Sequence, residues 1–247
     1  MTHRRDSVSQ HITRKELKHD RIAETFVHGV EEVATHQKQL WIFGSIALVV
    51  ILAVFGWRFY SERQTVKAQA ALDEAMKIFN ARIRSVGEPE EPGEITYLEE
   101  KYKFADAAKK FADVAGKYSL TQPGKLANYY AGLSYAQVGN YEEAKKWLRA
   151  AEGGRDVELA GLARFQLAKV FAQSGNEVEA VKLFRALMEK PTTMVPKQVS
   201  MVALADYYST KNAPEAVKLY RQIKEEFPDT SAADHADERL LDLKPRS

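Results

Sequence analysis

The longest uninterrupted apolar stretch of the chain runs from Leu40 to Trp57 and reads LWIFGSIALVVILAVFGW. No ionisable side chain occurs in it, and Arg58 ends the run. At about 1.5 Å rise per residue, a helix of this length spans roughly 30 Å, the hydrocarbon core of a bilayer. Trp41 and Trp57 stand near its two ends, where aromatic rings favour the headgroup region. The pattern predicts a transmembrane helix over residues 39–60, because the core helix of a soluble protein is rarely apolar on all sides.

A cleaved secretory signal is the alternative interpretation of this stretch. Such a signal has an apolar part of roughly 7–15 residues and a small-x-small cleavage site directly after it. Here the apolar part is longer, and Ala68-Gln69-Ala70 lies behind four charged residues. A retained signal anchor therefore fits better. Basic residues flank the stretch on both sides, so the positive-inside rule leaves the orientation open.

The segment 1–38 before the span is polar. Thr13 and Glu16 have the spacing of a capping box, and a narrow apolar stripe follows at helical intervals. This predicts either an amphipathic helix that contacts the membrane surface or a partner, or a frayed polar tail. Five histidines recur every eight or nine residues, whereas two histidines that chelate one metal ion from a helix stand four apart. We therefore expect no metal site from His3, His11, His19, His28 and His36.

After the span, the chain contains an internal repeat. Three segments align without gaps at an offset of 36 residues. A Gly-Asn pair precedes the first two segments and an Asn precedes the third. An aromatic residue stands nine positions before the alanine of each segment. The segments are Glu143–Arg149 (EAKKWLR), Glu179–Arg185 (EAVKLFR) and Glu215–Arg221 (EAVKLYR). The pattern predicts helical hairpins in which an aromatic side chain packs against a small one, since two helices approach closely only at small residues. The predicted packing residues are Tyr135 with Ala144, Phe171 with Ala180, and Tyr207 with Ala216.

These units resemble the tetratricopeptide repeat (TPR), whose usual length is about 34 residues. The matching positions are Gly132, Tyr135, Ala144 and Leu148; Ala168, Phe171, Ala180 and Phe184; and Leu204, Tyr207, Ala216, Tyr220 and Pro228. The resemblance departs from the family in the two extra residues per repeat and in the terminal proline, which the first unit lacks and which is shifted to Pro191 in the second.

A fourth, degenerate unit is expected before these three, with Ala70–Ile83 as its first helix and Phe104–Phe111 in its second. Between them, Ser85–Glu94 is acidic and rich in Pro and Gly, so it predicts a solvated insertion or a docking loop. At the other end, Ser231–Leu243 predicts a capping helix with Leu240, Leu241 and Leu243 facing inward. The expected fold is all-α: one transmembrane helix, then a TPR-like α-solenoid of about four helix pairs over residues 61–247 with a C-terminal capping helix.

Composition excludes several function classes. The net charge is +2, and the residues after Tyr60 contain as many acidic as basic side chains, so nothing indicates a nucleic-acid partner. The chain has no cysteine, which rules out disulfides and thiolate metal sites. No phosphate-binding loop or catalytic cluster is present, and acidic residues alternate with Lys and Arg as on solvated helices. We expect no enzyme, cofactor, metal or small-molecule substrate.

In TPR proteins the first helix of each repeat lines a concave binding face. Transferring those positions predicts a largely apolar groove for extended or partly unfolded peptides. Its residues are Tyr129, Leu133 and Ala136, then Phe165, Lys169 and Ala172, then Met201, Ala205 and Tyr208. Ordinary packing between helices is the alternative role for each of these residues.

A tail, one span and about four such repeats together resemble the ancillary SecYEG translocon subunit family of bacterial inner membranes. The resemblance implies a cytoplasmic N-terminus, a periplasmic repeat domain, and as partners the translocon, periplasmic chaperones or exported polypeptides. Two other functions remain open. One is a scaffold of a cell-envelope complex for outer-membrane assembly or division, and the other is a regulator that signals through the cytoplasmic tail.

Overall fold

The structure, a computed structural model, describes residues 37–89 and 91–243. The capping box, the apolar stripe and the five histidines of the tail lie outside the described residues. The chain divides between Tyr60 and Ser61 into two units. In the described part the fold is all-α, as predicted, with a single pair of two-residue strands.

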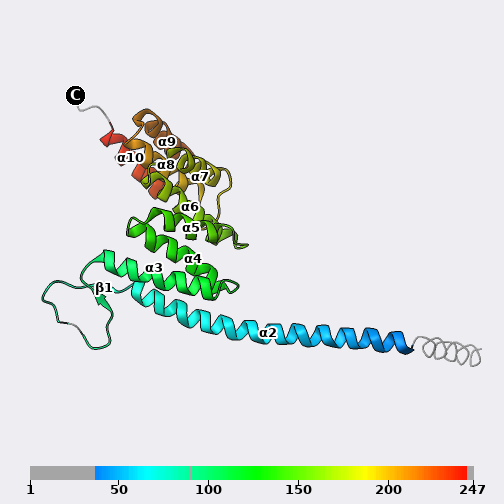
Figure 1. The fold of residues 1–247 in the computed structure, drawn as a ribbon. Helices are drawn as coiled ribbons and strands as arrows, with labels where there is room; N and C mark the ends of the chain where they lie inside the picture. Colours follow the sequence, from blue (N-terminus) through cyan, green and yellow to red (C-terminus); the bar gives the residue numbers. More distant parts are fainter. Residues whose placement is uncertain (1–36, 90, 244–247) are drawn as a thin grey trace, which may run out of the picture. The chain divides into compact units, whose positions relative to one another are not determined.

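The helices are α2 Gln37–Phe79, α3 Glu100–Lys117, α4 Gln122–Gln137, α5 Tyr141–Glu152, α6 Val157–Gln173, α7 Glu177–Glu189, α8 Lys197–Ser209, α9 Ala213–Glu226 and α10 Ser231–Asp242. Short connections join the helices from α3 to α10, whereas a long insertion over residues 80–99 separates α2 from α3 (Figure 1). The strands are β1 Arg82–Ile83 and β2 Thr96–Tyr97.

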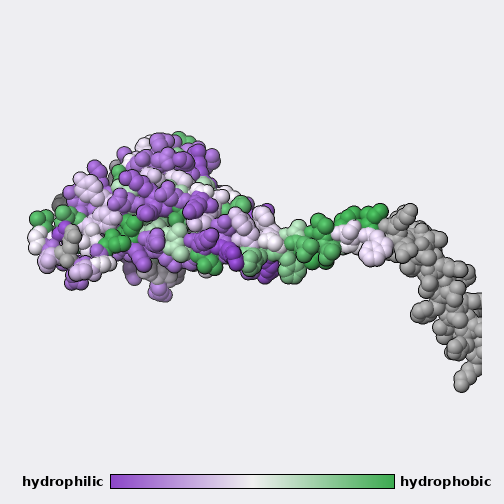
Figure 2. Space-filling model, turned by 60° about the horizontal axis from the view of Figure 1, so that its bottom comes forward, coloured by the Kyte–Doolittle hydropathy of each residue, from purple (hydrophilic) through white to green (hydrophobic). Residues whose placement is uncertain are grey.

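The first unit contains the apolar part of α2. Every side chain from Trp41 to Tyr60 is exposed, and Trp41, Phe55 and Trp57 are 74%, 69% and 65% exposed. Figure 2 shows this helix covered with hydrophobic side chains. The helix is long and apolar enough to cross a membrane, and its most apolar window is not buried against any described part of the chain. Leu40, the first residue of the apolar stretch, also belongs to α2.

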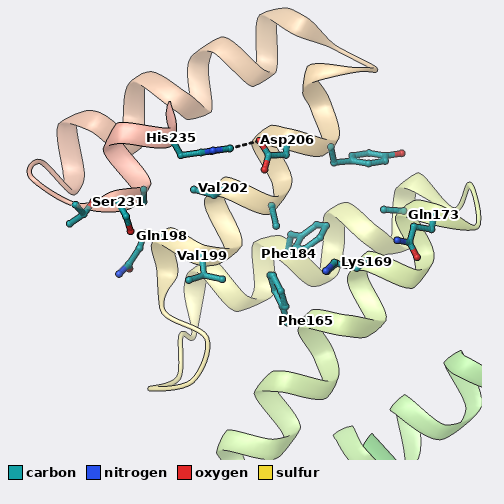
Figure 3. Close-up of a pocket in the computed structure, with 15 residues that line it drawn as sticks. Phe165, Lys169, Gln173, Phe184, Gln198, Val199, Val202, Asp206, Ser231 and His235 are labelled. Atoms are coloured by element: carbon teal, nitrogen blue, oxygen red, sulfur yellow. Dashed lines mark hydrogen bonds and ion pairs between the residues drawn. The ribbon is translucent and has the colours of Figure 1, made fainter. Parts of the chain in front are cut away.

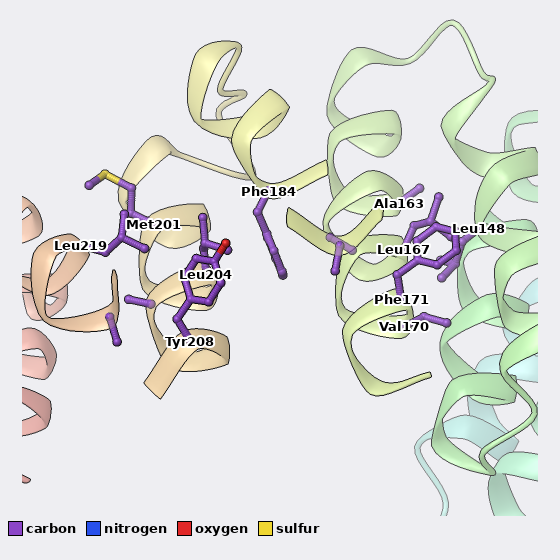
Figure 4. Packing of buried hydrophobic residues seen from close by; sticks show 14 of the residues in the cluster. Leu148, Ala163, Leu167, Val170, Phe171, Phe184, Met201, Leu204, Tyr208 and Leu219 are labelled. Atoms are coloured by element: carbon purple, nitrogen blue, oxygen red, sulfur yellow. The ribbon is translucent and has the colours of Figure 1, made fainter. Parts of the chain in front are cut away.

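In the second unit, consecutive helices from α3 to α10 pack side by side as antiparallel hairpins (Figure 1). Two clusters of buried hydrophobic residues form its core. The first joins the end of α2 to α3 and α4, where Phe111 is fully buried and stacks on Tyr130 with ring centroids 5.2 Å apart. The second runs from α4 to α10 and includes Leu148, Phe184 and Tyr220 (Figure 4). Each hairpin thus buries its apolar stripe against the next one.

The small residues of the repeat lie where the helices meet. Ala144, Ala180 and Ala216 have no exposed surface. A Cβ added to Gly132 would lie 2.5 Å from Cγ of Leu148, so α4 and α5 approach each other too closely for any larger residue at that position. Among the aromatic residues of the same pattern, Phe171 is buried, whereas Tyr135 and Tyr207 are half-buried.

The second helix of each repeat begins with the same cap. An asparagine side-chain oxygen accepts a hydrogen bond from the backbone N–H three residues later, which satisfies one of the free donors of the first turn. The N–H to oxygen distances are 3.3, 3.3 and 3.4 Å for Glu143 to Asn140, Glu179 to Asn176 and Glu215 to Asn212. This cap explains why the asparagine recurs every 36 residues.

The turns before these caps differ. Gly139 and Gly175 adopt left-handed backbone angles, with φ of 75° and 81°, which ends α4 and α6 within a residue or two. The third turn has no glycine, and the N–H of Asn212 bonds to the carbonyl of Tyr208 at 2.7 Å. In the first two turns the N–H of the capping asparagine bonds instead to the carbonyl five residues earlier, that of Tyr135 or Phe171. The third hairpin is therefore connected by a tighter, right-handed turn.

The first helix of the degenerate unit differs from the prediction at both ends, because it is not a separate helix from Ala70 but the last part of the continuous helix α2. It stops at Phe79 rather than Ile83, because Ile83 pairs with Tyr97 in a parallel bridge that closes the base of the insertion. The described residues of the insertion are non-helical, and Arg82 forms ion pairs with Glu88 at 2.6 Å and Glu94 at 3.3 Å across it.

The capping helix α10 also corrects one expectation. Leu240 and Leu243 are half-buried against the core cluster, but Leu241 is 65% exposed and does not face inward. At about 100° per residue, Leu241 points about 100° away from Leu240 and about 160° away from Leu243, so the three leucines cannot share one narrow inward face. Polar contacts hold much of the helix instead, among them an ion pair between Asp237 and Lys224 of α9.

We predict that Gly139→Ala and Gly175→Ala each lower the free energy of unfolding by about 1 kcal/mol, because an L-residue is strained at positive φ. Gly153→Ala is the matched control. Gly153 ends α5 with φ of −71°, and an added Cβ would make only ordinary contacts there. Urea unfolding of the full chain in detergent, followed by circular dichroism at 222 nm, measures all three. Equal effects at the three positions would contradict the role given to the left-handed turns.

Candidate peptide-binding pocket

A pocket of about 690 Å³ lies between α6, α8 and the start of α10 (Figure 3). This volume falls within the range of roughly 300–1,000 Å³ found for ligand sites. Its walls combine apolar side chains with a few polar ones. They are Phe165, Lys169, Ala172, Gln173 and Phe184; Gln198, Val199, Val202, Ala203, Asp206 and Tyr207; and Thr230, Ser231, Ala232 and His235.

The wall formed by α6 and α7 presents two aromatic rings and an amine. The rings of Phe165 and Phe184 meet edge to face with centroids 6.0 Å apart. Phe184 is almost fully buried, whereas Phe165 is half-buried and Lys169 exposed. The Lys169 Nζ lies 5.9 Å from the centroid of the Phe165 ring, within the distance of a cation–π contact.

The wall formed by α8 is the open counterpart of an interface that is closed one repeat earlier. Ala163, Leu167 and Phe171 of α6 are 0%, 2% and 4% exposed, because they pack against the preceding repeat. The residues 36 positions later are Val199, which is 39% exposed, and the half-buried Ala203 and Tyr207. The pocket is thus a gap at the junction between the second and third repeats.

The segment between α7 and α8 positions this open wall. It runs over residues 190–196, and Glu158 of α6 fixes it by accepting hydrogen bonds from the backbone N–H groups of Met194 at 2.7 Å and Thr193 at 3.2 Å. The Met194 bond, followed by that of Thr193, lowers the pKa of Glu158. Val195 is buried at its end. The segment sets where α8 begins, and α8 has 13 residues where α6 has 17.

The third wall belongs to α10, which a polar network attaches to α8 and α9. The Oδ1 atom of Asp206 accepts hydrogen bonds from the Tyr220 hydroxyl at 2.6 Å and pairs with His235 Nε2 at 2.9 Å. Nε of Arg239 lies 3.8 Å from the same oxygen, and its Nη2 donates to the Ser209 hydroxyl at 3.1 Å. Asp206 therefore joins three helices at the edge of the pocket. Burial, and then the hydrogen bond to Asp206, raise the pKa of Tyr220 to about 12.

A second pocket of about 700 Å³ lies on α7, with Tyr208 of α8 at one edge. Its lining is more strongly charged and includes Glu177, Lys182, Arg185 and Glu189. It contains fewer apolar side chains than the first pocket. We therefore consider the first pocket the stronger candidate for an apolar segment.

The structure places only part of the groove predicted from sequence in this pocket. Phe165, Lys169 and Ala172 line it. Met201 and Ala205 are fully buried in the core, and Tyr208 is buried beside the second pocket. Tyr129 is buried in the core cluster, and Leu133 and Ala136 are half-buried against it. The prediction assumed that α6 and α8 expose corresponding residues. In the structure, the α8 residues Val199, Ala203 and Tyr207 line the pocket, and they correspond to residues of α6 that are buried.

Residues that the sequence did not predict complete the pocket, above all Val199, Val202, Asp206 and His235. One signal could have found the last of them. Extending the 36-residue register by one more period aligns His235 with Val199 and Ala163, which makes α10 the first helix of a further repeat. Among the described residues, no group of three or more His, Asp or Glu side chains could hold a metal ion.

A family model described as the tetratricopeptide repeat-like domain matches residues 38–193. The chain belongs to this tetratricopeptide repeat-like family. The match includes the apolar stretch and the first repeats, and it ends within the segment that precedes α8. TPR-like domains are protein–protein interaction modules and are typically non-catalytic. No curated protein matches the chain.

We predict that Tyr220→Phe changes how the stability of this TPR-like domain depends on alkaline pH. An unfolded tyrosine ionises near pH 10, whereas Tyr220 in the folded domain ionises near pH 12. Its contribution to stability is therefore complete below pH 10 and is lost as the pH rises to 12. The wild type should lose more stability over this interval than the variant, as measured by urea unfolding at a series of pH values. Other tyrosines titrate in both proteins, so parallel curves would contradict the assignment.

Proposed function

We propose that this chain is a membrane-anchored TPR protein that binds extended, apolar segments of other polypeptides between α6, α8 and α10. The observation that carries the proposal is the open interface at α8. Val199, Ala203 and Tyr207 are accessible there, whereas their counterparts one repeat earlier are covered. An apolar segment that entered the gap would bury the surface that the preceding repeats bury against each other.

We further propose that a bilayer covers the apolar part of α2. Exposed apolar patches of this extent are rare on soluble monomers and mark membrane or protein interfaces. Continuous exposure from Trp41 to Tyr60 supports a lipid environment, because a protein partner would cover one side of the helix rather than all of it. The proposed location is the bacterial inner membrane, with the N-terminus in the cytoplasm and the repeat domain in the periplasm.

The role that fits these features is that of an ancillary factor beside the Sec translocon, which binds exported polypeptides as they emerge or passes them to periplasmic chaperones. The resemblance drawn from the repeats and the span supports this role. A tether raises the local concentration of the pocket around emerging chains, so weak binding is sufficient. The pocket is suited to weak binding, because it holds a short apolar contact rather than an extensive interface.

Crosslinking in intact cells tests the client. A photoreactive amino acid at Val202, inside the pocket, should capture many unrelated exported polypeptides. The matched control is Val157, which is 69% exposed at the start of α6 and lies outside the pocket. One abundant partner captured at Val202 would favour a scaffold instead. Equal capture at both positions would contradict a peptide-binding role for the pocket.

Protease digestion tests the anchor and its orientation. In spheroplasts, added protease should degrade the domain over residues 61–247, whereas in intact cells the domain should be protected. Detergent, but not alkaline carbonate, should extract the protein from membranes. Extraction by carbonate, or protection of the domain in spheroplasts, would overturn the proposed anchor or its orientation respectively.

A further inference from the structure

The charge within the pocket is unevenly balanced. Lys169 projects from α6 beside the Phe165 ring, and in the described part of the chain no carboxylate lies within ion-pair distance of its ammonium group. The ammonium is therefore a donor without an anionic partner at the edge of an apolar surface. An anion that reached it would form a solvent-exposed ion pair, whose strength falls as salt is added.

Asp206, the carboxylate that lines the opposite wall, is already engaged. Its Oδ1 atom accepts from Tyr220, pairs with His235 and lies 3.8 Å from the guanidinium of Arg239. These contacts offset its negative charge and hold it toward α10. The pocket therefore offers one free positive charge to a ligand and no equally free negative charge.

The distance between the ammonium and the apolar surface constrains the ligand. In an extended peptide, side chains two residues apart lie on the same face, about 6.6 Å from each other. The Lys169 ammonium is 5.9 Å from the centroid of the Phe165 ring. When a bulky apolar side chain of the ligand packs against Phe165, the exposed and flexible Lys169 side chain can therefore reach the side chain two positions away.

We propose that the pocket recognises an internal segment in which a bulky apolar residue and an acidic residue are separated by one residue, an inference that rests on the proposed peptide-binding function. An acidic side chain suits Lys169 better than a chain terminus does. Capture of a terminal carboxylate relies on several converging donors, whereas this site supplies a single ammonium. The specificity comes from the pairing of one apolar contact with one charge at a fixed spacing.

Fluorescence anisotropy with the full chain in detergent micelles tests the proposal. The probes are fluorescein-labelled Gly/Ser peptides, amidated at the C-terminus, with a central Phe-Ser-Asp, Phe-Ser-Lys or Phe-Asp-Ser sequence. The Phe-Ser-Asp peptide should bind about two- to fivefold more tightly than the other two. Added salt should reduce this difference. Equal affinity for the three peptides would overturn the proposal.

A charge reversal provides the decisive comparison. Lys169→Glu should weaken binding of the Phe-Ser-Asp peptide and strengthen binding of the Phe-Ser-Lys peptide, so that the preference inverts. Lys218→Glu is the matched control, since Lys218 is exposed on α9 and lies outside the pocket. It should leave both affinities unchanged. The same preference in Lys169→Glu as in the wild type would overturn the assignment of Lys169.

A third variant separates this proposal from the function on which it rests. Val202→Glu should abolish binding of every peptide while circular dichroism shows an intact helical domain. If Val202→Glu abolishes binding but the three peptides bind the wild type equally, the peptide-binding function stands and the acidic preference is wrong. If no peptide binds the wild type and Val202 crosslinks no exported chain in cells, both proposals fail.

Discussion

A helical hairpin cannot bury its own apolar stripe, and the second unit of this chain is built around that constraint. Each hairpin packs on the next, and within the hairpins the fully buried alanines Ala144, Ala180 and Ala216 allow the helices to approach closely. Glycine at 132 has the same effect between α4 and α5. The core is therefore a series of interfaces between neighbours.

The interfaces are not equally closed. At the junction of the first and second repeats, Leu148 and Phe171 are buried. At the junction of the second and third, hydrogen bonds to Glu158 hold the segment 190–196 in place before α8, and the corresponding flank of α8 remains accessible. The polar contacts of Asp206 then attach α10 beside the gap without filling it. The pocket results from a local departure from the repeat, on a scaffold that the repeat makes rigid.

The sequence was sufficient to predict the all-α fold and the positions of the repeated helices. These follow from the 36-residue spacing of the capping asparagines and of the small residues, each of which has a local physical role. The pocket could be predicted only in part. Phe165 and Lys169 were predicted correctly because α6 keeps the regular geometry of the repeat. Met201 was placed in the groove but is buried, because the flank that α8 exposes depends on the segment 190–196 before it. The hydrogen bond from the backbone N–H of Met194 to the Glu158 side chain is not part of the repeated pattern, so the sequence could not predict it.

The arrangement also explains why a weakly binding pocket could serve a tethered protein. An interface that is closed by the chain itself gains its stability once, on folding, and cannot respond to a partner. The open flank of α8 is also apolar but is not covered by the chain, so under the proposed function a segment of another polypeptide would bury it. Because such a contact is small, its lifetime is short. Under the proposed function, a domain held at a membrane would compensate for short lifetimes by repeated encounters, and rapid release would suit a factor that binds many polypeptides in turn.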